Sequence, residues 1–295
     1  MESMILRNID HSAYLWISLL LLAVSVLPFI IHLEGRRIRA REVAMLSLLS
    51  AMTILGDLLS QTVLPIQMGT AMVILSGIAF GPETGFLVGS LSRFLVNFFL
   101  GQGIWTPWQM FAWGLLGFLA GLSFNKVSPS LKDPYDRWKA KNQRNSRSFR
   151  LLTGPMLSLL SCELLGYISY LILPLGDHTF WGWRVYAFGF LGLLLGLLFQ
   201  HRRLPADSVT LTAFSFVTVL ILYGGIMNLS TVLTANTLSE LTPREFWDSA
   251  RAYYLAGLSY DLWHAFRTAF IVFLLGNRVL SRLERVKIKY GFYRI

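Results

Sequence analysis

The chain of 295 residues has little charge, a single cysteine and none of the short motifs that mark common catalytic sites. Cys162 has no cysteine to pair with, which excludes an internal disulfide framework. No phosphate-binding GxxxxGK loop, CxxC pair or HExxH helix occurs, and the five histidines are scattered. The sequence therefore predicts no catalytic residues, no metal site and no cofactor, and it argues against an enzyme.

What the chain has instead is apolar sequence. Hydrophobic residues make up 54% and charged residues 14%, whereas a soluble domain would carry about 25% charged residues. Apolar stretches of roughly 20 residues recur, each long enough to cross about 30 Å of hydrocarbon as a helix. We therefore predict an all-α, multi-pass protein of the cell membrane with about nine transmembrane helices. The expected spans are 13–33, 42–60, 66–81, 85–100, 107–124, 151–173, 183–200, 209–230 and 256–280.

The basic residues are distributed unevenly between these spans. Loops 34–41, 125–150 and 201–208 and the tail after residue 276 hold most of the 26 Lys and Arg, and all four fall on one side. By the positive-inside rule that side is the cytoplasm, which places the C-terminus inside and the N-terminus outside. The net charge of +10 then reflects topology and contact with membrane lipid, not nucleic acid.

Segment 101–124 combines a polar, tryptophan-rich start with a helix that carries a glycine face. Gly114, Gly117 and Gly121 are spaced three and four residues apart, which suits close packing against another helix. Residues 183–199 match residues 108–124 at 9 of 17 positions, all three glycines included. We interpret the copy as a duplicated helix pair that serves as scaffold; coincidence in Gly- and Leu-rich sequence is the alternative.

Polar residues inside predicted spans indicate where the chemistry lies, because they are expensive at membrane depth. Many of them fall in the outward half of their helices, close to the tryptophan-rich start of segment 101–124. This pattern predicts a pocket that opens to the outside, with a few convergent polar groups. The predicted substrate-binding residues are Asp57, Arg93, Asn97, Gln102, Trp105, Trp108, Gln109, Asn228, Asp261 and His264.

Each of these residues also has a purely structural interpretation. Arg93 could pair with Asp57 or with Asp261 simply to hold the bundle together. Asp261 and His264 could stabilise the start of the last helix. The tryptophans could be ordinary residues of the interfacial belt.

Three separated motifs resemble a known family. GPETGFLVGSLSRFLVNFFLGQGIWTPWQMFAWGLLGFLAG from residue 81, YGGIMN at 223–228 and GLSYDLWHAF…LERVKIKYG at 257–291 resemble substrate-specific S components of energy-coupling factor (ECF) transporters. The resemblance covers about 42–124 and 183–291. It implies a six-helix membrane subunit that captures a vitamin or related micronutrient from outside. Such a subunit would then pass its ligand to a T component driven by two ATPase subunits.

The chain departs from that pattern by extra helices. We expect four parts: 1–41, an extra helix and basic turn; 42–124, the first part of the core; 125–182, a basic loop and inserted helix region; and 183–295, the repeat helix, the rest of the core and a basic tail. The resemblance implies a docking face of small residues on the first core helix, here Ala44, Ser47, Ser50 and Ala51. The WTPWQ motif resembles S components assigned to cobalamin or related corrinoids.

Two other classes stay open. In an intramembrane enzyme acting on a lipid or prenyl substrate, Asp261, His264 and Arg93 would act as acid, base and anion clamp. A stand-alone secondary transporter would show broken helices in inverted repeats. The repeat found here has the same predicted direction in both copies.

Overall fold

A computed structural model describes residues 16–27, 40–62, 66–124, 155–173, 179–198, 203–236 and 242–290. Over these residues the regular elements are helical, apart from an isolated β-bridge between Phe124 and Leu204. The predicted all-α class is confirmed. The predicted basic loop 125–150 lies outside the described residues.

Two helices, Ala40–Ser60 and Ser208–Ala235, are long and apolar enough to cross a membrane. Shorter apolar helices accompany them at Trp16–Leu27, Met68–Phe80, Leu157–Ile172 and Trp183–Leu198. These helices agree with a membrane protein, while the number of nine crossings stays a prediction.

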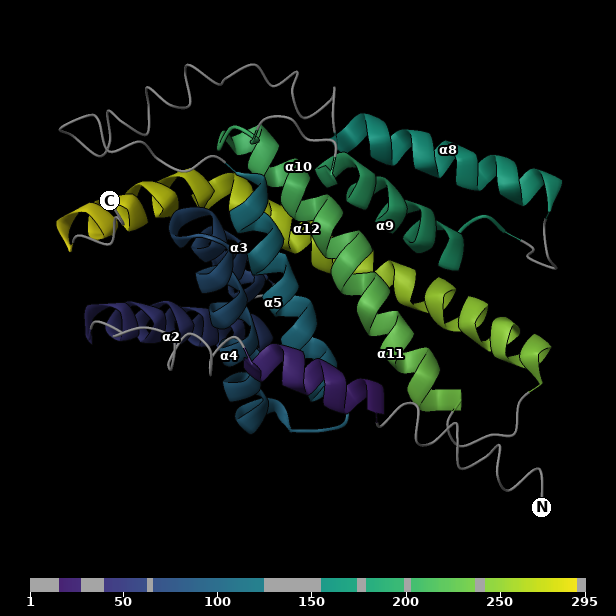
Figure 1. Ribbon diagram of the computed structural model, residues 1–295, viewed down its shortest axis with the longest axis horizontal. Helices are drawn as coiled ribbons and strands as arrows, with labels where there is room; N and C mark the ends of the chain where they lie inside the picture. Colours follow the sequence, from purple (N-terminus) through teal and green to yellow (C-terminus); the bar gives the residue numbers. More distant parts are fainter. Residues whose placement is uncertain are drawn as a thin grey trace.

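Along the chain, the helices after the first one divide into two groups (Figure 1). The first group is α2 (Ala40–Thr62), α3 (Met68–Phe80), α4 (Pro82–Leu100) and α5 (Thr106–Ser123). The second is α8 (Leu157–Ile172), α9 (Trp183–Leu198), α10 (Ser208–Thr218), the π-helical turn η2 (Val219–Tyr223), α11 (Gly224–Asn236) and α12 (Pro243–Lys289). The two groups pack against each other through α3 and α12. Two glycines with positive φ, Gly81 at 105° and Gly101 at 106°, bound α4, because few other residues adopt that backbone conformation.

Glycine faces bring α3, α4 and α5 into backbone contact. A Cβ atom added to Gly77 or Gly85 would collide with the carbonyl oxygen of Gly117, and one added to Gly117 would collide with the backbone of Gly85. The packing role predicted for the first glycine face is therefore confirmed. The copy uses the same device on another partner: Gly192 and Gly196 of α9 lie against the start of the α8 segment.

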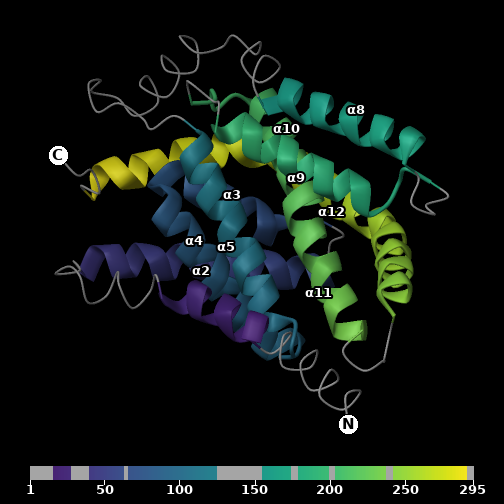
Figure 2. The ribbon, with the colours of Figure 1, turned by 45° about the vertical axis from the view of Figure 1, so that its right-hand side comes forward.

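The α8–α9 pair lies at one side of the bundle. In both views α8 lies beyond α9, on the side away from α2 (Figures 1 and 2). α8 packs chiefly against α9, while α9 also contacts η2, α11 and α12. The α8–α9 pair thus lies at the edge of the bundle and does not separate α2, α3, α4 and α5 from one another.

The last helix differs from the prediction. The predicted spans 209–230 and 256–280 leave residues 231–255 between them as a connecting loop. Instead α11 continues to Asn236, and α12 is one helix of 47 residues. Its start is fixed by a capping box: Thr242 accepts a hydrogen bond from the Glu245 backbone N–H, and the Glu245 side chain accepts one from the Thr242 N–H. At 1.5 Å per residue α12 is about 70 Å long, which is more than the thickness of a membrane.

Contacts between helix ends agree with the predicted alternation of sides. Arg41 donates to the Tyr290 carbonyl, and Lys287 donates to the Ala79 carbonyl. These residues come from segments expected on one common side of the membrane. At the opposite ends, the rings of Trp183 and Trp247 lie 5.7 Å apart.

The N-terminal helix Trp16–Leu27 turns its serines inward. Ser18 and Ser25 are buried, whereas Leu19, Leu20 and Leu27 are exposed. An apolar outer face with a polar inner face is the arrangement expected of a helix whose outer surface meets lipid.

Candidate functional site

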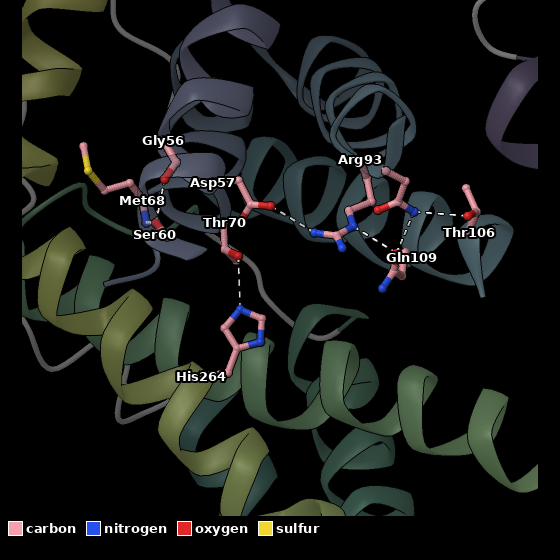
Figure 3. A network of polar contacts seen from close by, with 10 residues as sticks. Gly56, Asp57, Ser60, Met68, Thr70, Arg93, Thr106, Gln109 and His264 are labelled. Atoms are coloured by element: carbon pink, nitrogen blue, oxygen red, sulfur yellow. Dashed lines mark hydrogen bonds and ion pairs between the residues drawn. The ribbon is translucent and has the colours of Figure 1, made fainter. Parts of the chain in front are cut away.

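The polar residues predicted from sequence form two centres. The first, here called the Arg93 centre, lies between α2, α4 and α5 (Figure 3). Arg93 of α4 donates from Nε to Gln109 Oε1 at 3.0 Å and from a terminal nitrogen to Asp57 Oδ2 at 3.0 Å. Its guanidinium lies 5.0 Å from the ring centroid of Trp113. Of the two structural partners considered for Arg93, the structure selects Asp57.

Amide and hydroxyl groups extend the Arg93 centre toward the loop between α4 and α5. Asn97 Nδ2 donates to Gln109 Oε1 at 2.9 Å and to Thr106 Oγ1 at 3.1 Å. The Thr106 hydroxyl in turn donates to Gln102 Oε1 at 2.9 Å. Three other predicted residues, Asn97, Gln102 and Gln109, therefore share one network with the Asp57–Arg93 pair. Thr106, which was not predicted from the sequence, joins Asn97 to Gln102.

The first centre also leaves buried polar atoms unsatisfied. In the part of the chain that the structure describes, Asp57 Oδ1, Asn97 Oδ1 and Trp113 Nε1 have no hydrogen-bond partner. The side chains are almost wholly buried, at 1% exposure for each of these three residues. Because an unpaired buried polar atom is costly, such groups indicate a missing partner such as a ligand.

The second centre, here called the Asp261 centre, joins α9, α11 and α12. Tyr186 of α9 donates to Asp261 Oδ2 at 2.5 Å, and Asn228 Nδ2 of α11 donates to the same oxygen at 2.8 Å. Tyr254 packs its ring 5.0 Å from that of Tyr186 and donates to the Gly225 carbonyl. The copy helix, predicted to be scaffold, therefore supplies a side chain to a predicted site residue. A lone tyrosine in an apolar span gave no signal for this contact in the sequence.

His264 of α12 connects the two centres. Its Nε2 shares a hydrogen bond of 3.1 Å with Thr70 Oγ1 of α3, as Figure 3 shows, and its ring lies 4.6 Å from that of Tyr223. His264 Nδ1 is buried without a partner in the described part of the chain. The His264 contacts place α3 between the centres.

Two glycines next to Thr70 and Tyr223 connect these contacts to Asp57 and Asp261. A Cβ on Gly69, beside Thr70, would lie 2.7 Å from Asp57 Cβ, and a Cβ on Gly224, beside Tyr223, would lie 2.7 Å from Asp261 Cγ. The two centres are thus linked by one chain of packed residues.

The tryptophans differ in their surroundings. Trp105 is 45% exposed, whereas Trp108 is 3% exposed and donates from Nε1 to Ser18 Oγ at 3.0 Å. The sequence predicts both at a pocket that opens to the outside. The N-terminal helix covers Trp108, because its buried serine supplies a hydrogen-bond acceptor at that position.

The small residues predicted as a docking face on α2 do not all face outward. Ala44, Ser47 and Ala51 are exposed. Ser50 is buried, and its carbonyl accepts a hydrogen bond from Ser92 of α4. Ser50 therefore packs inside the bundle, since a three-residue step along the helix turns it away from the exposed face.

Comparison with known proteins supports the resemblance seen in the motifs. Residues 37–140, which span α2 to α5 and all of the Arg93 centre, match the family model of the ECF-type riboflavin transporter, S component. This segment is therefore similar to the S-component family over about a third of the chain. No cluster of three metal-ligating side chains is found among the described residues.

The curated relatives match a shorter part of the chain. A UPF0397 protein of Aliivibrio fischeri (strain MJ11) is 31% identical over 70 residues, which are 22% of this chain and 38% of the relative. A UPF0397 protein of Vibrio atlanticus (strain LGP32) is 36% identical over 52 residues, 18% of this chain and 28% of the relative. The matched part thus spans less than half the length of these relatives. No solved structure matches the chain significantly.

Proposed function

We propose that the chain is a membrane-embedded substrate-binding subunit of an ECF-type importer. The observation that carries this proposal is the Arg93 centre, a buried polar network with unsatisfied atoms inside the segment that matches the S-component family. Hydrogen-bonding groups buried without partners are what a small, polar ligand would satisfy on binding. The ten predicted residues from Asp57 to His264 are proposed as its contacts, with the Asp261 centre as the second wall.

The proposed orientation follows the basic loops. The ends that carry Arg41, Lys287 and Tyr290 face the cytoplasm, and the loop between α4 and α5 faces outside. A ligand would then enter from outside and be passed to a T component with its ATPase subunits. Ala44, Ser47 and Ala51 are the proposed docking residues on α2, with Ser50 behind them.

The substrate is proposed as a vitamin or related micronutrient. Riboflavin is named by the matching family model, and cobalamin or another corrinoid is suggested by the WTPWQ motif. Both candidates offer polar edges to amide and guanidinium donors and flat surfaces to tryptophan rings.

The arrangement disfavours the enzyme alternative. Arg93 is occupied by Asp57 and Gln109, and Asp261 is occupied by Tyr186 and Asn228. An acid, a base and an anion clamp would have to converge on one reacting bond. The structure brings these groups to two different centres instead.

The test is ligand capture by the purified chain in mild detergent. Small molecules that remain bound are identified by mass spectrometry, and affinities for riboflavin and cobalamin are measured by titration. Asn97→Ala removes two hydrogen bonds of the Arg93 centre without adding or removing charge. The variant also removes Asn97 Oδ1, a buried acceptor without a protein partner among the described residues that is proposed to bind the ligand. We expect about a tenfold loss of affinity, because a buried hydrogen bond left unmade costs about 1–3 kcal/mol.

Asn277→Ala is the matched control. Asn277 is also an asparagine on a helix with one side-chain hydrogen bond, to Ser208, and an unpartnered oxygen. It lies 13 residues beyond His264 along α12, away from the proposed pocket, so its variant should bind the ligand normally. Equal affinities for the two variants and the unchanged protein would show that the pocket is elsewhere. ATP hydrolysis by the purified chain alone would contradict the proposal that separate ATPase subunits hydrolyse ATP.

A further inference from the structure

The C-terminal part of α12 carries a row of basic side chains on its exposed surface. Arg278, Arg282, Arg285 and Lys289 are all exposed. Their spacing of four, three and four residues places them on one face of the helix. We call these four residues the basic ridge.

The basic ridge continues an exposed aromatic face of the same helix. Trp263, Phe266 and Phe270 are about half exposed, and their rings stack in sequence, with centroids 5.9 and 6.4 Å apart. Large apolar side chains exposed along a helix of a membrane protein face lipid tails. Along one side of α12, therefore, a surface suited to acyl chains passes directly into a surface suited to anions.

The length of α12 indicates where along the membrane normal the aromatic face gives way to the basic ridge. With about 70 Å of helix and a hydrocarbon layer of about 30 Å, the helix extends well beyond the membrane interior. Figures 1 and 2 show its C-terminal end projecting past α3, α4 and α5. The basic ridge begins four residues after Leu274, which is itself exposed. This places the guanidinium groups at the level where lipid headgroups begin.

The ridge is not explained by internal ion pairs or by the helix dipole. Among the described residues, none of its four side chains makes an ion pair, whereas the neighbouring Lys287 pairs with Glu284. Of the ridge residues only Lys289 lies in the last turn of α12, where the helix dipole favours cations, whereas Arg278 lies eleven residues before the end of the helix. Arg41 adds to the positive field, since it is exposed and donates to the Tyr290 carbonyl.

We propose that the basic ridge is a binding site for the headgroups of anionic phospholipids, with the acyl chains along the aromatic face of Trp263, Phe266 and Phe270. The bound lipid fixes the C-terminal end of α12 at the membrane surface. A headgroup phosphate accepts hydrogen bonds from several guanidinium groups at once, which suits arginine more than lysine.

The experiment measures lipid binding to the full-length chain in detergent by native mass spectrometry. Phosphatidylglycerol is titrated against phosphatidylcholine, and inorganic phosphate is used as a competitor. The test variant is Arg282→Gln with Arg285→Gln. We expect binding of phosphatidylglycerol to weaken roughly 30-fold, because each basic side chain near an anionic surface contributes about a factor of five. Phosphatidylcholine binding should not change.

The control removes the same charge from the other end of the same helix. Arg244→Gln with Arg251→Gln alters two basic residues near the start of α12 and should leave phosphatidylglycerol binding within twofold. Arg282→Lys with Arg285→Lys should restore most of the binding and shows whether a loss is due to charge or to misfolding. Thermal melting of every variant checks folding independently.

Three outcomes would overturn the proposal. One is that the ridge and control variants bind phosphatidylglycerol equally. Another is that millimolar inorganic phosphate displaces the lipid completely, which would make the ridge a free-phosphate site. The third is that the ridge variants keep lipid binding but lose association with a T component and ATPase module, which would make the ridge a protein-docking surface.

Discussion

The Asp57–Arg93 pair offers the sharpest test of how the bundle is held together. Asp57 is 1% exposed and Arg93 9% exposed. Unit charges centred about 4 Å apart attract by about 4 kcal/mol at an effective dielectric constant of about 20. Asp57→Asn keeps the shape of the side chain but leaves the Arg93 charge buried with only Gln109 and the Trp113 ring beside it. Breaking a buried pair in this way costs about 3–5 kcal/mol, and we expect a loss of stability in that range.

The assay is reversible unfolding in detergent, arranged as a double-mutant cycle of Asp57→Asn and Arg93→Met. Asp248→Asn is the control, since Asp248 pairs with Arg251 at 2.8 Å but its side chain is 56% exposed. Exposed pairs contribute about 0–1 kcal/mol, so the control should change stability little. A coupling energy below about 0.5 kcal/mol between Asp57 and Arg93 would refute the reasoning.

Three further predictions concern the glycine packing of α5, the contact of the N-terminal helix with Trp108, and the start of α12. Gly117→Ala should destabilise the protein by about 1–3 kcal/mol in the same unfolding assay, because its Cβ would collide with the α4 backbone. Ser18→Ala removes a hydrogen-bond acceptor of Trp108 and should cost about 0.5–1.5 kcal/mol, measured by thermal melting against Ser18→Thr. The pKa of Glu245 is lowered by hydrogen bonds from the backbone and the hydroxyl of Thr242. The first turn of α12 should therefore be fully stabilised above pH 4.5 and should fray as the pH falls through that lowered pKa. Amide exchange at the start of α12 measures this, and Glu245→Gln should abolish the dependence.

The features that could be predicted from the sequence are those that require a specific packing partner or a charge partner. Three glycines on one helix face imply a close approach, and the structure places Gly117 against Gly77 and Gly85. A charged residue in an apolar span requires a partner of opposite charge, and Arg93 pairs with Asp57, one of the two partners considered. In both cases the free-energy cost of leaving the residue without its partner is high, so the residue type and its position in an apolar span are enough to predict the interaction.

The partners of neutral residues could not be predicted in the same way. Tyr186 fits an apolar helix whether or not its hydroxyl is bonded, so nothing in the sequence indicates its bond to Asp261. The continuity of α12 was missed for a related reason. Its first turns are polar, which resembles a loop next to a membrane span, although the capping box at Thr242 is also a helix-start signal.

Whether the two centres act together on one ligand can be decided at Tyr186. The hydroxyl of Tyr186 positions Asp261, and the chain of contacts through Gly224, Tyr223 and His264 links Asp261 to the Arg93 centre. Tyr186→Phe removes a hydrogen bond to a charged group and should lower stability by about 1.5–3 kcal/mol.

The effect on ligand affinity shows whether the Asp261 centre binds the ligand or only stabilises the helix packing. If this centre forms the second wall of the pocket, Asp261→Asn should weaken the ligand at least as much as Asn97→Ala does, and Tyr186→Phe should weaken it less, because Asn228 still holds the carboxylate. Titrations on the same protein preparations as the melting curves compare the two effects. An unchanged affinity for Asp261→Asn, together with reduced stability, would mean that the Asp261 centre only holds α9 and α11 against α12. The pocket would then be confined to α2, α3, α4 and α5, the helices within the family match.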